Sequence, residues 1–276
     1  MTENLSHPAD NIGFYRAFAH VYTAAYRDVD ADETVRQWAQ LLDRIEGMKE
    51  SLTDDGLGAD GRVPRLLDVA CGPGWHLPAW SACGFDVWGL DVNPEMLSLA
   101  AGSISRHQMS AAHLVLADIR EVPTAYLELH RRFDLATAHF NFPHLFSRQE
   151  LVSALSGVAA CLRPDGYFLF DFTPLPPTPP EPVDEFVDAG GQQLRLNGKF
   201  DDSLGCYVQH WSCQDLDTVE HYWFHGANEM REAIASAGMN LKCVLGWHPE
   251  NHAAPWESPS GTSHRAMYVC HRLLQS

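Results

Sequence analysis

The sequence predicts an α/β protein with a seven-stranded, mainly parallel sheet, helices on both faces, an N-terminal helical cover and an antiparallel β insertion. Two observations predict this fold class. Short apolar runs alternate with segments of helical spacing between residues 63 and 173, which is typical of parallel strands joined by crossover helices. Beyond a proline-rich stretch, short strands separated by polar turns follow one another, which is typical of antiparallel pairing.

The first 62 residues are expected to form a helical cap. Residues 12–48 show two helical patterns, and Phe14, Phe18 and Val21 share one face of the first. Acidic residues from Asp30 onward open the second helix, where the helix dipole favours negative charge. The turn-rich residues 53–64 form a linker to the next segment.

Residues 63–173 are expected to form the core of the sheet. Asn93 caps a helix whose first position is Pro94, and a second helical pattern covers residues 149–162. Ligands of parallel sheets bind outside the carboxyl ends of the strands. The predicted strands are 66–70, 85–90, 112–117, 133–139 and 167–172.

The last two segments are expected to be an insertion and the completion of the sheet. Six prolines lie between residues 174 and 182, which predicts a stiff, extended connector. Together with antiparallel strands at 192–196, 205–214 and 217–224, the connector makes up the segment 174–226, a lid for an acceptor. Residues 227–276 contain a helix at 228–237 and strands at 241–247 and 266–271 that would complete the core sheet.

Composition and charge exclude several classes of protein. Of the 276 residues, 45% are apolar, and no apolar run approaches the ~18 residues that read as a membrane span. The formal net charge of −17 disfavours nucleic acid and anionic membranes as partners. The first eleven residues lack the basic start and apolar stretch of a secretory signal, so we expect a cytoplasmic location.

Cysteine and histidine spacing gives no metal signature. The seven cysteines form no C-x-x-C pair, and a cytoplasmic chain would keep them as reduced thiols. The fifteen histidines are scattered and form no H-E-x-x-H pattern. The sequence therefore predicts no metal site.

A glycine turn and three acids at strand ends, Asp68, Asp91 and Asp118, predict a nucleoside site. The first strand runs into Gly72 and Gly74, whose missing side chains let the backbone approach a ligand closely. Asp91 ends the second strand, 19 residues after Gly72, where a carboxylate can accept both hydrogen bonds from a ribose diol. Asp118 ends the third strand and is placed to meet an adenine amino group.

The series of motifs resembles class I S-adenosylmethionine-dependent methyltransferases, in the branch that modifies small molecules and natural products. The resemblance covers roughly residues 64 to 173 and implies a Rossmann-like fold, S-adenosylmethionine as cofactor and methyl transfer as activity. It is carried by Asp68-x-Ala70-x-Gly72-x-Gly74, by residues 87–97 around Asp91, by Ala117-Asp118-Ile119, by Phe133-Asp134-Leu135 and by residues 162–168.

The resemblance also implies roles for single residues. Asp91 would hold the ribose, Asp118 the adenine amino group, and Met96 would lie on the adenine face. Asp68 would orient the glycine turn, whose backbone would hold the methionine portion. Tyr15-x-x-x-Ala19-x-x-Tyr22 is similar to the helix that covers the cofactor in small-molecule members. The expected cofactor contacts are Tyr15, Tyr22, Asp68, Ala70, Gly72, Gly74, Asp91, Val92, Met96, Asp118, Ile119 and His139.

The acceptor is expected to be a small aromatic or hydrophobic molecule. In methyl transfer the protein must hold the acceptor atom in line with the methyl group, and a base of near-neutral pKa helps when that atom carries a proton. Histidines near the fourth strand end and in the inserted strand are candidate bases. Nitrogen, oxygen and carbon acceptors all stay open, as does homodimer formation. The candidate catalytic residues are His139, His144, His225 and Tyr222.

Two other functions remain open at this point. A nicotinamide-dependent oxidoreductase could use the same glycine turn and ribose acid. Leu77 stands where its third glycine would fall, however, and no Tyr-x-x-x-Lys occurs. A non-catalytic protein could keep the S-adenosylmethionine site without methyl transfer.

Overall fold

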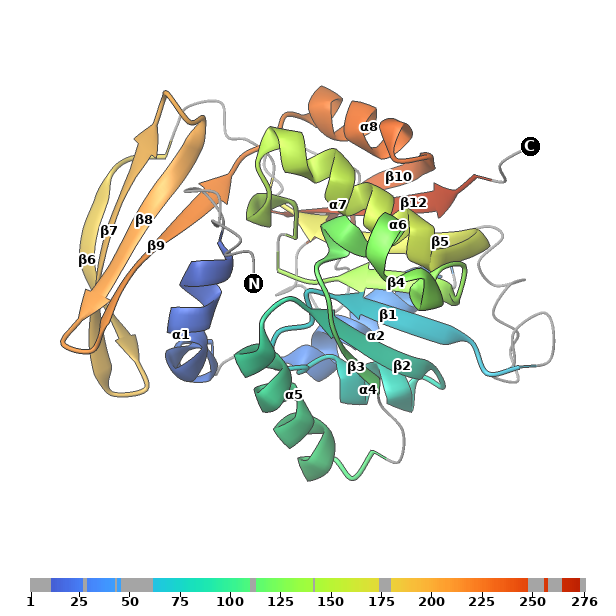
Figure 1. Cartoon of the computed structure of the whole chain (residues 1–276), viewed down its shortest axis with the longest axis horizontal. Helices are drawn as coiled ribbons and strands as arrows, with labels where there is room; N and C mark the ends of the chain where they lie inside the picture. The colour runs from blue at the N-terminus through green and yellow to red at the C-terminus, as the bar shows by residue number, and fades with distance from the viewer. Residues whose placement is uncertain are drawn as a thin grey trace.

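The computed structural model describes residues 11–26, 29–42, 44–45, 62–109, 113–140, 142–173, 180–247, 256–257 and 265–273. Most of the predicted linker (53–61) and of the proline-rich connector (174–179) lies outside the described residues. No helix in the described part is long and apolar enough to cross a membrane. Two sheets dominate the structure, with helix α1 between the smaller sheet and the rest (Figure 1).

The predicted seven-stranded, mainly parallel sheet is confirmed. Its strand order is β11-β10-β12-β5-β4-β1-β2-β3, in which the two-residue β11 (Trp256–Glu257) is an addition that the sequence pattern did not predict. The pairs among β1 to β5 are parallel, whereas β12 pairs with β5 and β10 in antiparallel fashion. The strand bounds are β1 (Arg65–Val69), β2 (Asp86–Asp91), β3 (His113–Leu116), β4 (Phe133–Ala138), β5 (Leu162–Phe172), β10 (Met239–Trp247) and β12 (Arg265–Arg272).

Helices cover both faces of this sheet, because alternate strand residues point to opposite sides. Leu67 packs into a core under α6 (Val122–Ala125), α7 (Arg148–Cys161) and α8 (Ala227–Ser236), and its neighbour Leu66 packs into the opposite core. That second face carries α2 (Ala31–Leu42), α4 (Leu77–Ala82) and α5 (Pro94–Arg106) (Figure 1). Short 3-10 turns η1 (Ile119–Glu121), η2 (Leu127–Leu129) and η3 (Phe142–Leu145) flank β4.

The insertion forms a separate four-stranded antiparallel sheet, called the small sheet below. Its order is β6 (Val183–Ala189), β7 (Gln192–Asp201), β8 (Cys206–Cys213) and β9 (Leu216–Trp223). Strand β6 was not predicted. It begins directly after the last proline of the connector and reaches β7 through Gly190 and Gly191, whose φ angles of 69° and 94° suit a tight turn.

Helix α1 (Ile12–Ala25) packs on the small sheet and stands between it and α5 (Figure 1). Phe14 and Phe18 join Leu194, Leu196 and Trp211 in a hydrophobic cluster that is separate from both cores of the large sheet. The apolar face predicted for this helix therefore has the small sheet as its partner.

Asn11 fastens the start of α1 to β9, an edge strand of the small sheet. Its side-chain Nδ2 donates to the carbonyl oxygen of His221 at 2.7 Å, and its Oδ1 accepts from the backbone N–H of His221 at 2.8 Å. Asn11 is buried, with 4% of its surface exposed. The amide thus satisfies both backbone groups of one edge residue.

Replacing Asn11 with alanine is expected to lower the free energy of unfolding by about 1–3 kcal/mol, because both backbone groups of His221 lose their partner. Urea unfolding measures the change. Asn11→Asp sets a buried carboxylate oxygen against the His221 carbonyl oxygen, so its loss should be at least as large. Equal stability of the alanine variant and the parent chain would contradict this role.

Candidate active site

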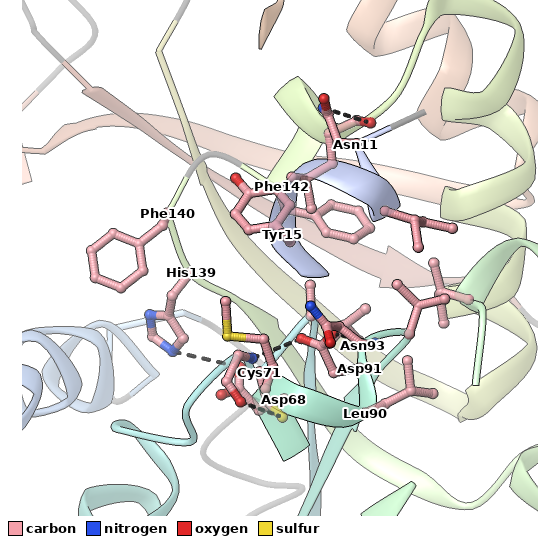
Figure 2. A pocket seen from close by; sticks show the side chains of 18 of the residues that line it. Asn11, Tyr15, Asp68, Cys71, Leu90, Asp91, Asn93, His139, Phe140 and Phe142 are labelled. Atoms are coloured by element: carbon pink, nitrogen blue, oxygen red, sulfur yellow. Dashed lines mark hydrogen bonds and ion pairs between the residues drawn. The ribbon is translucent and has the colours of Figure 1, made fainter. Parts of the chain in front are cut away.

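A pocket opens at the carboxyl ends of β1, β2 and β4 and beneath α1. It encloses about 1050 Å³ of space, part of it open to solvent. Figure 2 shows Tyr15 and Phe142 on one side, Asp68 and Asp91 on the other, and His139 toward one end. Every predicted cofactor residue except Gly74 lines this pocket. Their individual roles stay predictions.

The two glycines of the turn, Gly72 and Gly74, have different surroundings. Both have positive φ, +52° at Gly72 and +69° at Gly74. A Cβ atom at Gly72 would have no atom within 4 Å, whereas a Cβ at Gly74 would lie 2.8 Å from the Cβ of Ala100 on α5. Gly72 therefore leaves room for a ligand, and Gly74 lets the turn pack against α5.

Gly74→Ala is expected to destabilise the fold by about 2–5 kcal/mol, the sum of overpacking and of a left-handed alanine. Gly72→Ala carries only the second cost of about 1–2 kcal/mol, but its methyl group points into ligand space. Thermal unfolding and calorimetry with S-adenosylhomocysteine should show the larger stability loss for Gly74→Ala and the larger affinity loss for Gly72→Ala. The reverse ranking would contradict this division.

Asp91 joins the glycine turn to the start of α5. Its Oδ2 accepts from the backbone N–H of Gly72 at 2.8 Å, and its Oδ1 accepts from the backbone N–H of Asn93 at 2.9 Å. Asn93 in turn caps α5 by accepting from the Glu95 N–H, as predicted. Burial raises the pKa of Asp91 to about 6, although these N–H bonds lower it. Two backbone N–H groups thus hold the Asp91 carboxylate in place.

Asp68 lies at the base of the pocket, with 1% of its surface exposed. Its Oδ1 accepts from the Thr137 hydroxyl at 3.1 Å, while its buried Oδ2 has no hydrogen-bond partner. Burial raises the pKa of Asp68 to about 8. The pocket therefore contains an unused acceptor that gains a partner if a ligand brings a positive charge.

His139 is fixed beside Asp68 as a neutral ring. It is stacked against His76 at 3.7 Å and against Trp38 at 4.0 Å between ring centroids. Trp80 Nε1, which can only donate, lies 3.3 Å from His139 Nε2, so the ring proton sits on Nδ1. That buried Nδ1 has no hydrogen-bond partner. Burial holds the pKa of His139 well below its usual value.

Asp68, His76 and His139 bring three possible metal-ligand atoms within 4.8 Å of one another. The two imidazole planes are only 8° from parallel, with centroids 3.7 Å apart. A transition metal binds in the plane of each ring at about 2.0–2.1 Å from nitrogen, and one ion cannot lie in two parallel planes this far apart. The arrangement suits a polar organic ligand better than a metal ion.

Asp118 has a partner that the sequence pattern did not reveal. Arg120 Nη2 lies 2.6 Å from Asp118 Oδ2, and the backbone N–H of Arg120 donates to Oδ1 at 2.9 Å. Arg120 also pairs with Glu150 on α7 and lines the pocket. The negative charge of Asp118 is therefore largely neutralised by Arg120 before any ligand binds.

Tyr15 and Tyr22 of α1, called the cover helix below, lie over the pocket. Tyr15 and Tyr22 both line it, and the Tyr22 ring is stacked on Trp75 with centroids 5.6 Å apart. Trp75 follows the glycine turn directly, so its contact with Tyr22 joins α1 to that turn. This tryptophan could not be predicted as a pocket residue, because nothing in its spacing marks a contact with α1.

Of the four candidate catalytic residues, only His139 is among the residues that line the pocket. His144 is stacked on Tyr222 at 3.8 Å and makes a short contact with the backbone oxygen of Trp223. His225 Nε2 lies 3.0 Å from the Pro143 carbonyl oxygen, and its Nδ1 lies 3.3 Å from Glu229. Both histidines join η3 to the end of the small sheet, and their role as bases stays a prediction.

Comparisons with known proteins agree with this architecture. Residues 66–166 match a family model described as a methyltransferase domain. A malonyl-[acyl-carrier protein] O-methyltransferase from Enterobacter lignolyticus is 35% identical over 40% of this chain and 39% of its own length. A dTDP-3-amino-3,6-dideoxy-alpha-D-glucopyranose N,N-dimethyltransferase from Streptomyces fradiae is 35% identical over 41% of this chain and 44% of its own length. The chain thus spans less than half the length of either relative.

Likeness of fold extends further than likeness of sequence. The crystal structure of an S-adenosylmethionine-dependent methyltransferase from Clostridium acetobutylicum aligns with a TM-score of 0.69 at 17% identity, over 94% of this chain and 99% of that one. The chain therefore has the fold of S-adenosylmethionine-dependent methyltransferases. The sequence match to a methyltransferase domain, at residues 66–166, falls within this fold.

Proposed function

We propose that this protein transfers a methyl group from S-adenosylmethionine to a small organic acceptor by in-line displacement. The observation that carries the proposal is one pocket in which the strand-end acids Asp68, Asp91 and Asp118 meet the tyrosines of the cover helix. These residues come from four separate segments of the chain.

The donors and acceptors in the pocket fit this cofactor. The unpaired Asp68 Oδ2 complements an ammonium group, and the unpaired Nδ1–H of His139 complements a carboxylate. Asp91 would hold the ribose diol, and Met96 and Ile119 line the same pocket as apolar neighbours for the adenine. When bound, S-adenosylmethionine supplies a methyl carbon that its sulfonium already activates. The chain's own task is to position the acceptor and exclude water.

Leu77 weighs against the nicotinamide alternative. Its side chain is fully buried, and its Cδ1 would lie 3.1 Å from a Cβ atom at either Gly74 or Gly89. A dinucleotide fingerprint needs a glycine at this point so that helix and strand can approach each other beside a pyrophosphate. Here a leucine fills that space.

Aromatic side chains favour a flat or hydrophobic acceptor of the natural-product kind. Tyr15, Tyr22, Trp75, Phe140 and Phe142 all line the pocket. Phe140 holds its ring there with a φ of +63°, a left-handed conformation that costs a bulky residue about 1–2 kcal/mol. One relative is named for O-methylation and the other for N-methylation, which supports methyl transfer without choosing the acceptor atom.

Thermal shift with S-adenosylmethionine, S-adenosylhomocysteine and NAD tests the proposal. A ligand that binds only the folded state raises the unfolding temperature. We expect both sulfur nucleosides to stabilise the chain and NAD to leave it unchanged. Stabilisation by NAD alone would overturn the proposal. Binding of the sulfur nucleosides without methylated product across acceptor classes would favour a non-catalytic binding protein.

A further inference from the structure

Glu220 on β9 is a carboxyl group that none of the functions above uses. Its Oε1 accepts from the hydroxyl of Tyr15 at 3.1 Å. Because Tyr15 lines the pocket, this bond places Glu220 next to the cavity on the side of the small sheet. The two hydrogen bonds between Asn11 and the backbone of the neighbouring residue His221 hold this part of β9 against the cover helix.

Tyrosine rings surround this carboxyl. Tyr222 lies two residues further along β9 and therefore on the same face of the strand. On α1, Tyr15 contacts Tyr22 at 6.2 Å between centroids, and Tyr22 contacts Tyr26 at 4.7 Å. Burial, followed by the negative charge of Glu220, raises the pKa of both Tyr15 and Tyr222, so these hydroxyls stay protonated and neutral.

No positive side chain neutralises Glu220 within the part of the chain that the structure describes. Arg265, whose charge acts on Tyr222, lies 3.2 Å from the fully buried Asp171. Glu220 itself is only partly exposed, and burial raises its pKa to about 7. A carboxyl without a counter-ion among electron-rich rings is a favourable site for a cation, because the ring faces and the carboxylate attract the same charge.

We propose that the acceptor is an amine, that its ammonium form binds between Glu220 and the pocket-lining rings of Tyr15 and Tyr22, and that Glu220 takes its proton. This proposal rests on the proposed methyl transfer and names the acceptor class. The ammonium gives one proton to the Glu220 carboxylate, which frees the nitrogen lone pair. The lone pair then bonds to the methyl carbon, and the carbon–sulfur bond breaks with its electrons staying on sulfur.

The test compares two small probes, 2-phenylethylamine and 2-phenylethanol, which differ in the group that Glu220 would recognise. Each is titrated by ligand-observed NMR into the full chain saturated with S-adenosylhomocysteine. We expect the amine to bind at least about tenfold more tightly than the alcohol. Glu220→Gln should remove that preference, while alcohol binding and S-adenosylhomocysteine affinity change less than about twofold.

Two controls keep a structural effect apart from a charge effect. Glu185→Gln removes an exposed carboxyl from the same sheet and should leave the amine preference intact. Between pH 5.5 and 8.5, amine affinity should rise in the parent chain as Glu220 ionises. The rise should be clearly smaller in Glu220→Gln, in which only the pocket carboxyls Asp91 and Asp68 still titrate over this range. A structural role alone would not produce that difference.

The outcomes separate this proposal from the methyl transfer on which it rests. Equal affinity for the two probes, no detectable amine binding, or an amine preference that survives in Glu220→Gln would overturn the amine proposal alone. A base among His139, His144 and His225 would then be the better assignment. Failure of S-adenosylhomocysteine to bind would overturn the proposed function itself.

Discussion

Asp91→Ala is expected to weaken S-adenosylhomocysteine binding by about 10²–10⁴-fold. Each hydrogen bond to a charged group contributes about 1.5–3 kcal/mol, and the variant would lose two such bonds to a ribose diol. It would also release the N–H groups of Gly72 and Asn93, which now donate to the two carboxylate oxygens at 2.8 and 2.9 Å. The glycine turn and the start of α5 would lose their common anchor. Isothermal titration calorimetry measures the affinity.

Two variants control this result. Asp91→Asn keeps the shape and one acceptor oxygen, so its affinity should fall between those of the parent chain and the alanine variant. Asp86→Asn removes a carboxylate from the opposite end of the same strand, where it pairs with the partly exposed Arg65 at 3.1 Å. Such pairs contribute little, so binding should be unchanged. An unaltered affinity in Asp91→Ala would remove the ribose assignment.

Raising the pH from 4 to 8 is expected to destabilise the ligand-free protein through Asp68. The folded chain holds this proton up to a pKa of about 8, whereas the unfolded chain releases it near the ordinary value of 3.8. Between those two values the folded state binds more protons, so the free energy of unfolding falls as pH rises. Each pKa unit corresponds to about 1.4 kcal/mol, which gives a total on the order of 5 kcal/mol.

Ligand binding should reverse this effect. An ammonium group beside Asp68 favours the ionised carboxylate, so binding of S-adenosylhomocysteine at pH 7 should release about one proton. Calorimetry in buffers of different ionisation enthalpy counts that proton. Asp68→Asn should release none from this position, and its stability should vary less between pH 4 and 8. Equal proton release by the parent chain and the variant would show that Asp68 does not meet the ligand's charge.

The core of the fold and the cofactor side of the pocket follow from local sequence signals. Apolar runs that end in the glycine turn after residue 70, in Asp91 and in Asp118 predict strands, and parallel strands bring their carboxyl ends to one edge. The capping pattern at Asn93 is equally local, and the structure has the predicted bond to Glu95. These predictions need only neighbouring residues and the rules of parallel sheets.

The side of the pocket toward α1 and the small sheet could not be predicted in the same way, because its contacts join distant segments. Asn11 bonds to His221 across 210 positions, and Tyr15 bonds to Glu220 across 205. Alternation along β9 correctly separates His221 from Tyr222, but it does not say what faces either residue. Strand β6 was not predicted, because the prolines that precede it gave no signal for where strand pairing begins. Strand β11 was not predicted, because two residues are too few to show an alternating pattern.

The shared hydrophobic cluster of α1 and the small sheet has a consequence for changing acceptor preference by chimeras. Phe14 and Phe18 are buried against strands that lie about 180 residues away in the chain. Exchanging the small sheet alone between related enzymes would leave those phenylalanines against a foreign surface. A successful transplant should therefore carry residues 11–26 and 183–223 together, as two pieces of one recognition module.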